Sequence, residues 1–182
     1  MAAIIILVVV VLILLYGVAT YNKLVRLRNQ SEESAAAIDA NLKKRYDLVP
    51  NLVETVKGYA AHEQKTLTAV IEARNKAMSA TTLTEKNDAS NAFSATLKSL
   101  FALSESYPDL KANQGFLDLQ AQLQKIEDDL LQARKYYNAI IGDINTMVQT
   151  IPSSIVASLA RFTKLPYLAI EEEARNRVDV KF

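Results

Sequence analysis

The sequence opens on an uncharged and strongly apolar segment. Residues 1–22 contain no charged side chain, and Ala2 to Thr20 form 19 consecutive positions without a charge. At about 1.5 Å per residue, a helix of this length spans roughly 28 Å, which matches the hydrocarbon core of a bilayer. The segment predicts a transmembrane anchor over residues 1–21, followed by a separate body over residues 22–182.

A cleaved signal peptide is the alternative interpretation of this segment, because Gly17 to Ala19 offers the small residues that a signal peptidase prefers. No lysine or arginine precedes the run, however, and it is longer than the apolar core of about 7–15 residues in a signal peptide. We therefore expect an anchor that stays attached.

The flanks of the anchor differ in charge. Tyr16 and Tyr21 lie near its C-terminal end, where aromatic rings favour the membrane interface. The basic residues Lys23, Arg26 and Arg28 follow directly, and positive charge is retained mainly on the cytoplasmic side of a membrane. We expect a single-pass protein with the lipid bilayer as a partner, its N-terminus outside and its body in the cytoplasm.

The rest of the composition excludes several kinds of chemistry. The chain has no cysteine, so thiolate nucleophiles, cysteine-based zinc sites and iron–sulfur ligation are absent. Its 21 basic and 20 acidic residues leave no general positive field for phosphates. The one basic run, Lys43 to Arg45, is flanked by Asp39 and Asp47, which favours a solvated helix face. We expect no nucleic-acid partner and no cofactor.

The body is predicted to be helical. Four glycines and four prolines are too few for an all-β chain, which needs turn residues at short intervals. Between Pro108 and Pro152, apolar residues recur at alternating spacings of three and four, which predicts one long helix with a coiled-coil-like seam. The seam comprises Phe116, Leu119, Leu123, Ile126, Leu130, Ala133, Tyr137, Ile140, Ile144, Met147 and Ile151.

Another long helical region is predicted over Asn22–Ala80, its first part continuing from the anchor and its middle kinked or broken at Pro50. A polar connector over Ala80–Thr84 leads to a shorter helix that stops at Pro108, and Ser153–Phe162 would form a last short helix. The predicted fold is all-α: an N-terminal transmembrane helix followed by an elongated antiparallel bundle of three to four helices.

A series of ordered motifs resembles the LemA family of bacterial membrane proteins. They are Tyr21–Val25, Leu42–Val53, Val56–Tyr59, His62-Glu63, Ala73-Arg74, Glu105–Ala112, Phe116–Gln120 and Arg134–Asn138. The resemblance runs from the anchor to about Phe162. It implies a single-pass anchor in the bacterial inner (cytoplasmic) membrane with a cytoplasmic helical bundle, and it supplies no agreed catalytic activity. The C-terminal tail, residues 163–182, departs from the family in carrying Glu171–Glu173 and in lacking the proline expected near Val180–Phe182.

We expect the motif residues to be structural rather than catalytic. They are Asp47, Pro50, Asn51, Gly58, Tyr59, His62, Glu63, Arg74, Tyr107, Pro108, Arg134, Tyr137 and Asn138. Asp47 would cap a helix whose first turn holds Pro50, or Pro50 would kink a continuing helix. The functional alternative is a binding site at the carbonyl that Pro50 frees in the preceding turn.

The pair His62-Glu63 raises the possibility of a metal or acid–base site. It lacks the second histidine of the HExxH motif, and a ferritin-like di-iron site would need two Glu-x-x-His units where this chain has one histidine. Tyr59 stands where the glutamate of such a unit would be. We therefore predict no metal site.

Some charged residues also occupy positions on or near the helix faces that apolar residues otherwise form. Glu63 and Arg74 are eleven residues apart, three turns along one helix face, and Arg45 and Arg134 lie near similar seams. The favoured interpretation is that these charges pair across the bundle with their stems lying along apolar surface. The alternative is a buried ion pair between Glu63 and an arginine that fixes helix register.

Two functions follow from these features. The first is a non-catalytic, membrane-tethered scaffold that self-associates through its long helical faces, or holds other envelope proteins, aided by the alanines at Ala35–Ala37 and Ala60-Ala61. The second is a membrane-tethered small-ligand sensor or enzyme with a pocket near Pro50 and His62. An enzyme needs converging reactive groups, and the best available set is Tyr59, His62 and Glu63.

Overall fold

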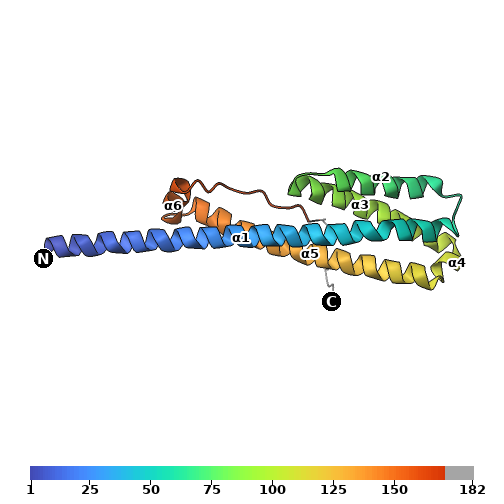
Figure 1. Cartoon of the computed structure of the whole chain (residues 1–182), viewed down its shortest axis with the longest axis horizontal. Coiled ribbons are helices and arrows are strands. Elements are labelled where there is room, and N and C mark those ends of the chain that lie inside the picture. The colour runs from blue at the N-terminus through green and yellow to red at the C-terminus, as the bar shows by residue number, and fades with distance from the viewer. Residues whose placement is uncertain (171–182) are drawn as a thin grey trace, which may run out of the picture. The chain divides into compact units, whose positions relative to one another are not determined.

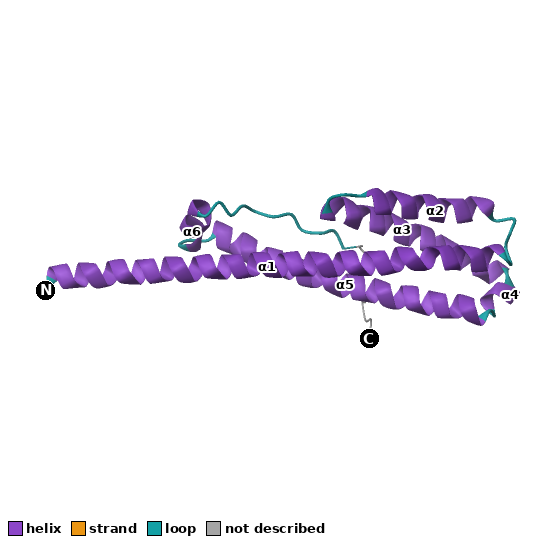
Figure 2. Ribbon diagram, in the orientation of Figure 1, coloured by secondary structure: helices purple, strands orange, loops and turns teal. Residues whose placement is uncertain are grey.

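The computed structural model describes residues 1–170, which form an all-α chain with no strand in that part. The helices are α1 (Ala2–Lys57), α2 (Gln64–Ser79), α3 (Leu83–Leu103), α4 (Pro108–Lys111), α5 (Gln114–Gln149) and α6 (Ser153–Leu159), with a 3₁₀ turn, η1, over Ser104–Ser106 (Figures 1 and 2). The all-α prediction is confirmed. The predicted features of the tail beyond Ile170 lie outside the described residues.

Packing divides the chain into two compact units. Unit 1 comprises Met1–Ala36 and Lys135–Tyr167, and unit 2 comprises Ala37–Arg134 with the residues from Leu168 onward. The long helices α1 and α5 contribute to both units. These units are defined by packing, so they do not test the predicted division between anchor and body at residue 21.

Unit 1 contains the apolar segment and a small aliphatic core. Among the described residues, α1 is the helix long and apolar enough to cross a membrane, and its apolar window is fully exposed. The first buried residue of α1 is Thr20. Further along, Leu27 packs with Ile140, Ile141 and Ile144 of α5. The exposed apolar segment fits a membrane anchor, and the core begins directly after it.

Unit 2 is an antiparallel bundle. The second half of α1, then α2, α3 and the first half of α5 run in alternating directions (Figure 1). Apolar residues at helical spacing meet in its interior. The buried ones are Ile38, Leu42, Tyr46, Val49, Leu52, Val53, Val56, Ala60, Leu67, Val70, Ala77, Phe93, Leu97, Leu100, Leu110, Phe116, Leu123, Leu130 and Leu168. The predicted antiparallel bundle of three to four helices is confirmed within this unit.

Of the two predicted alternatives at Pro50, a kink or a break of the helix, the break is wrong. Helix α1 passes through Pro50 and ends at Lys57, and Asp47 is an exposed residue within the helix rather than a cap. Buried apolar residues on both sides of the proline, Val49 and Leu52 among them, hold the helix against the bundle. The predicted helical region Asn22–Ala80 is instead divided at residues 58–63.

The other helix ends follow local capping chemistry. Thr82 caps α3, so the helix starts within the predicted connector Ala80–Thr84. The Thr82 side chain accepts a hydrogen bond from the Glu85 N–H, and the Glu85 carboxylate accepts one from the Thr82 N–H. Helix α5 begins at Gln114, where the Asn113 side chain accepts from the Phe116 N–H, so the predicted long helix starts later than Pro108 implied.

The seam of α5 packs within the chain. Five of its residues are buried and five are half-buried, whereas Ile151 lies beyond the end of the helix and is exposed. The predicted last helix is confirmed as α6, although it ends at Leu159 rather than Phe162.

Candidate functional site

The most polar part of the unit 2 interior is a cluster around Arg45 of α1. Its side chain is 2% exposed, and its guanidinium donates to the hydroxyl oxygens of Ser90 at 3.0 Å and Ser94 at 2.8 Å on α3. The same group lies 2.6 Å from a carboxylate oxygen of Glu127 on α5 and 5.0 Å from the ring centre of Phe93. Arg45 thus connects three helices.

A second arginine joins this cluster from α5. Arg134 is 3% exposed and donates from Nη2 to the Ser90 hydroxyl oxygen at 3.1 Å. Ser90 therefore accepts hydrogen bonds from two guanidinium groups, one from α1 and one from α5. Such shared, charge-assisted hydrogen bonds are directional and fix how neighbouring helices face each other. We call Arg45, Ser90, Ser94, Glu127 and Arg134 the buried arginine cluster.

Tyr46 lies next to the buried arginine cluster and is itself buried. Its ring meets Phe93 edge-on with the ring centres 5.6 Å apart. Burial raises the pKa of the Tyr46 phenol above its usual value of 10.0, although the positive charge of Arg45 acts in the opposite direction. The phenol is therefore neutral at physiological pH.

The chemistry available to the buried arginine cluster is binding rather than proton transfer. An arginine remains protonated in proteins and cannot act as a general base. A serine hydroxyl becomes a nucleophile when a base lies beside it. The Ser94 hydroxyl lies 3.4 Å from a carboxylate oxygen of Glu127, but that carboxylate is already paired with Arg45 at 2.6 Å. The single histidine, His62, is exposed in the turn before α2. The cluster can hold helices together, or hold an anion.

A cavity of about 340 Å³ opens beside the buried arginine cluster. Its lining combines charged groups with apolar side chains of α3 and α5, namely Arg45, Ser94, Leu97, Lys98, Phe101, Leu123, Gln124, Glu127, Asp128, Leu131, Arg134 and Ile170. A second cavity of about 290 Å³ lies beside Asp39, Tyr46 and Lys86, where the Lys86 ammonium is 2.8 Å from an Asp39 carboxylate oxygen. Neither cavity is lined by Pro50 or His62, so neither is the pocket that was predicted near those two residues.

The carbonyl that Pro50 frees has a partner. Proline has no N–H, so the Tyr46 carbonyl, four residues earlier, lacks its helical donor. Arg74 of α2 supplies one instead, its Nε donating to that oxygen at 2.8 Å. The functional alternative of an open binding site at this carbonyl is therefore wrong, and the Pro50 and Arg74 motifs act together to join α2 to α1.

The predicted pair of Glu63 and Arg74 does not form. Glu63 lies in the turn before α2, where its carboxylate accepts a hydrogen bond from the Tyr107 hydroxyl at 3.1 Å. Burial, and then this bond to Glu63, raise the pKa of Tyr107. In the same region the Asn113 amide donates to the Tyr59 hydroxyl at 2.9 Å. Motif residues thus connect the turn at residues 58–63 with the segment that leads into α5.

The predicted carboxylate partner of the arginines is wrong: Arg45 pairs across the bundle with Glu127 rather than with Glu63. Arg45 does pair with Glu127 of another helix, yet Arg45 and Arg134 are both buried rather than at the surface. Within residues 1–170, no group of three or more histidine, aspartate or glutamate side chains is placed to hold a metal ion.

The remaining motif residues do not gather at one place. Asp47, Asn51, Gly58, His62 and Pro108 are exposed, and Pro108 occupies the first turn of α4. In unit 1, Tyr137 and Asn138 are half-buried, and burial raises the pKa of Tyr137. The flanking residues Tyr16, Tyr21, Lys23, Arg26 and Arg28 are all exposed along α1.

Sequence reasoning missed Ser90, Ser94 and Glu127. The signal was present in α3, where Asn87, Ser90 and Ser94 occupy buried positions at spacings of three and four that continue into Phe93 and Leu97. Small polar residues on the inward face of a helix indicate a buried polar partner. The arginines that meet them come from other helices, and a single sequence does not reveal that pairing.

Comparison with known proteins agrees with this architecture. The model of the LemA family matches residues 34–182. A protein of Metamycoplasma hominis called Protein LemA is 25% identical over 162 residues, which cover 87% of this chain and 73% of that protein. Because the family model matches well over half of the sequence, the chain belongs to the LemA family.

Proposed function

We propose that this protein is a non-catalytic scaffold that is anchored in the bacterial inner membrane and self-associates there. In this proposal the N-terminus is outside and the body is in the cytoplasm. The observation that supports the proposal most strongly is that the motif side chains make structural contacts. Arg45, Arg74, Glu63 and Tyr107 are engaged in contacts that join helices or turns of one bundle, rather than converging on a reactant.

Membrane attachment supports the proposal because it confines the chains to two dimensions. Confinement raises the effective concentration of neighbours, so weak contacts are enough for assembly. The apolar segment of α1 is exposed and family membership fits a membrane-anchored protein. The exposed basic residues Lys23, Arg26 and Arg28 after the segment favour a cytoplasmic body.

The surface that we propose for self-association is on α1. The seam of α5 is largely buried in its own chain and is not available to a neighbour. Ala36, Ala37 and Ala40 are exposed, and small side chains allow two helices to approach closely. Other envelope proteins that present a helix would bind the same face.

Cysteine cross-linking tests this surface, because the natural chain has no cysteine. The full-length Ala36→Cys variant, expressed at natural level and oxidised in native membranes, is expected to give a covalent dimer. The matched control is Ala121→Cys, which replaces an exposed alanine of α5. A strictly monomeric Ala36→Cys variant, or equal cross-linking of the two variants, contradicts self-association through this face.

The same variants test the topology. A maleimide that cannot cross membranes is expected to label Ala121→Cys in spheroplasts only after lysis, because the body is proposed to be cytoplasmic. Labelling of intact spheroplasts contradicts the proposed orientation. Affinity purification of the cross-linked full chain would then identify envelope partners.

A small-ligand sensor is the second candidate, favoured by the cavity of about 340 Å³ with Arg45 and Arg134 in its lining. Guanidinium groups bind carboxylates and phosphates with two parallel hydrogen bonds. A saturable rise in Tm of the full chain with inorganic phosphate or a small dicarboxylate would favour the sensor. An unchanged Tm across such anions would favour the scaffold.

A further inference from the structure

Helix α6 presents an exposed apolar row that the core of unit 1 does not use. Ile151, just before the helix, is 84% exposed, Ile155 is 60% exposed and Leu159 is 82% exposed. They are spaced four residues apart, so Ile155 and Leu159 share one face of α6. The opposite face is used for packing, since Ser153 and Ala157 are buried. The apolar row is therefore separate from the folded core.

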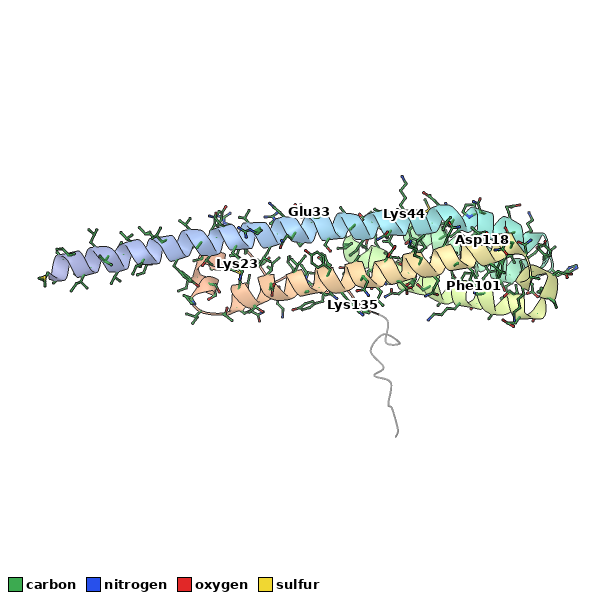
Figure 3. All side chains as sticks on the ribbon, turned by 90° about the horizontal axis from the view of Figure 1, so that it is seen from below. Lys23, Glu33, Lys44, Phe101, Asp118 and Lys135 are labelled. Carbon is green, nitrogen blue, oxygen red and sulfur yellow. The ribbon has the colours of Figure 1, made fainter. Side chains whose placement is uncertain are left out.

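The apolar row lies close to the end of the apolar segment. Helix α6 and the segment belong to the same compact unit. Leu27 of α1 packs on Ile140 and Ile144 of α5, and the rest of α5 then runs back along α1 toward its N-terminus (Figure 1). Figure 1 shows α6 beside α1, and Figure 3 labels Lys23 on α1 at this level. This is the level at which burial of α1 begins, at Thr20.

The two sequence segments nearest the apolar row carry only basic charges, and one of these, Arg28, also pairs at 3.3 Å with Glu32, one turn further along α1. Residues 20–28 and 150–167 together contain Lys23, Arg26, Arg28, Arg161 and Lys164 and no acidic residue. All five basic residues are exposed. Exposed apolar side chains beside basic ones are the pattern by which a helix lies in the headgroup layer of an anionic membrane.

We propose that Ile151, Ile155 and Leu159 insert into the interfacial layer of the bilayer that holds the anchor. Helix α6 then forms a second attachment, beside the first, and the basic residues around it contact anionic headgroups. The occupant of the apolar row is lipid rather than a second copy of the chain, because the row continues the apolar surface of α1 at the membrane boundary. The inference rests on the proposed membrane anchoring.

Tryptophan fluorescence tests the inference, because the natural chain has no tryptophan. The full-length Ile155→Trp variant is reconstituted in dilute vesicles of phosphatidylcholine and phosphatidylglycerol, with and without brominated phosphatidylcholine. For a side chain that lies at the headgroup boundary, brominated lipid is expected to remove roughly half of the emission. Leu159→Trp repeats the measurement at the other end of α6, in case one substitution disturbs folding.

Two reference variants make the result decisive. Leu15→Trp lies within the anchor and is expected to be quenched, whereas Ile71→Trp replaces a residue of α2 that is 42% exposed and is expected to keep its emission. If both α6 variants behave like Ile71→Trp while Leu15→Trp is quenched, the inference is wrong and the anchor stands. If Leu15→Trp is also unquenched, the anchoring itself fails. Blue-shifted but unquenched emission from the α6 variants would mean that protein covers the row, which also contradicts the inference.

Discussion

The two compact units are stabilised by different kinds of core. In unit 1, Leu27, Ile140, Ile141 and Ile144 form an aliphatic cluster that depends on shape and volume, and the directional bonds of the buried Asn145 to the Leu165 backbone are between uncharged groups. In unit 2, the buried arginine cluster adds directional, charge-assisted hydrogen bonds to the apolar interior. Aliphatic packing tolerates exchange of similar side chains, whereas a buried charge requires its particular partners. The bundle is thus the unit in which helix orientation is most closely specified.

The largest effect is expected from Arg45→Met. Removing one member of a buried ion pair leaves its partners without compensation, so the free energy of unfolding of the full chain should fall by about 3–5 kcal/mol. Urea unfolding followed by circular dichroism measures the loss, and hydrogen exchange locates it. Amides of α3 should lose protection first, because Ser94 loses its guanidinium donor and Ser90 loses one of its two.

The control for this variant is Lys44→Met, which replaces the exposed neighbour of Arg45. Its unfolding free energy should change by about 0.5 kcal/mol or less. If Arg45→Met costs no more than Lys44→Met, the buried arginine cluster is not what specifies unit 2.

In unit 1, the corresponding change is Ile141→Ala. It removes a fully buried side chain and should lower the free energy of unfolding by about 2–4 kcal/mol. Ile141→Leu keeps the volume and should cost less than about 1.5 kcal/mol. Arg45→Lys, by contrast, should recover little of the loss in unit 2, because an ammonium cannot replace the planar guanidinium. If Ile141→Leu and Arg45→Lys lower the free energy of unfolding by the same amount, the two cores do not differ in how they tolerate substitution.

The contact between Arg74 and the Tyr46 carbonyl is suited to a double-mutant cycle. Arg74→Ala alone should cost about 1–2 kcal/mol, because it leaves that carbonyl without a donor. In a Pro50→Ala background the backbone N–H returns, so Arg74→Ala should cost about 1 kcal/mol less. Additive effects in urea unfolding would show that the proline and the arginine act independently.

A smaller effect is expected from Thr82→Ala, which removes the side-chain cap of α3. The loss should be about 1 kcal/mol, measured in the same urea unfolding experiment. Thr84→Ala is the matched control, because Thr84 is an exposed residue inside the helix and is not the cap. A larger loss in the Thr84 variant would contradict the assigned start of α3.

The smallest effect is a pH dependence at the same cap. Backbone N–H groups of Thr82 and Thr81 bond to the Glu85 carboxylate and hold its pKa below the usual value of 4.5. A lowered pKa in the folded state stabilises the protein above the unfolded-state pKa, and this contribution disappears as the pH falls through the lowered value. The stability difference between wild type and Glu85→Gln should therefore be full at neutral pH and shrink in acid below pH 4.5. A constant difference across that range would argue against the bond.

The sequence predicted the helices well because their apolar spacing is a local property. It offered a helix break at Pro50 as an alternative to a kink, and the break does not form. The carbonyl that Pro50 leaves without a donor is bonded by Arg74, which belongs to another helix. The helix instead ends before residues 58–63, where Tyr59 and Glu63 bond to the segment before α5. Local rules predict that a proline leaves one helical carbonyl without its N–H donor. They do not predict that a side chain from another helix can supply a donor instead.

The candidate site was predicted less completely for the same reason. Arg45 and Arg134 stood out as charges near apolar seams, but their burial depends on three helices meeting around Ser90. Glu63 and Arg74 were paired by their spacing on one helix, whereas Glu63 lies in the turn before that helix. Spacing along the sequence predicts contacts within a helix, and the contacts here are between elements.

The continuity of α1 has a consequence for the order of events during synthesis. The ribosome completes all 56 residues of α1 before any residue of α3 or α5 has been made. At about 5–20 residues per second, the 70 residues from Lys57 to Glu127 take roughly 4–14 s. Throughout this interval Arg45 has no carboxylate from α5 to meet, although the apolar segment has already left the ribosome. The apolar segment is therefore available to a membrane before the core of the bundle can be completed.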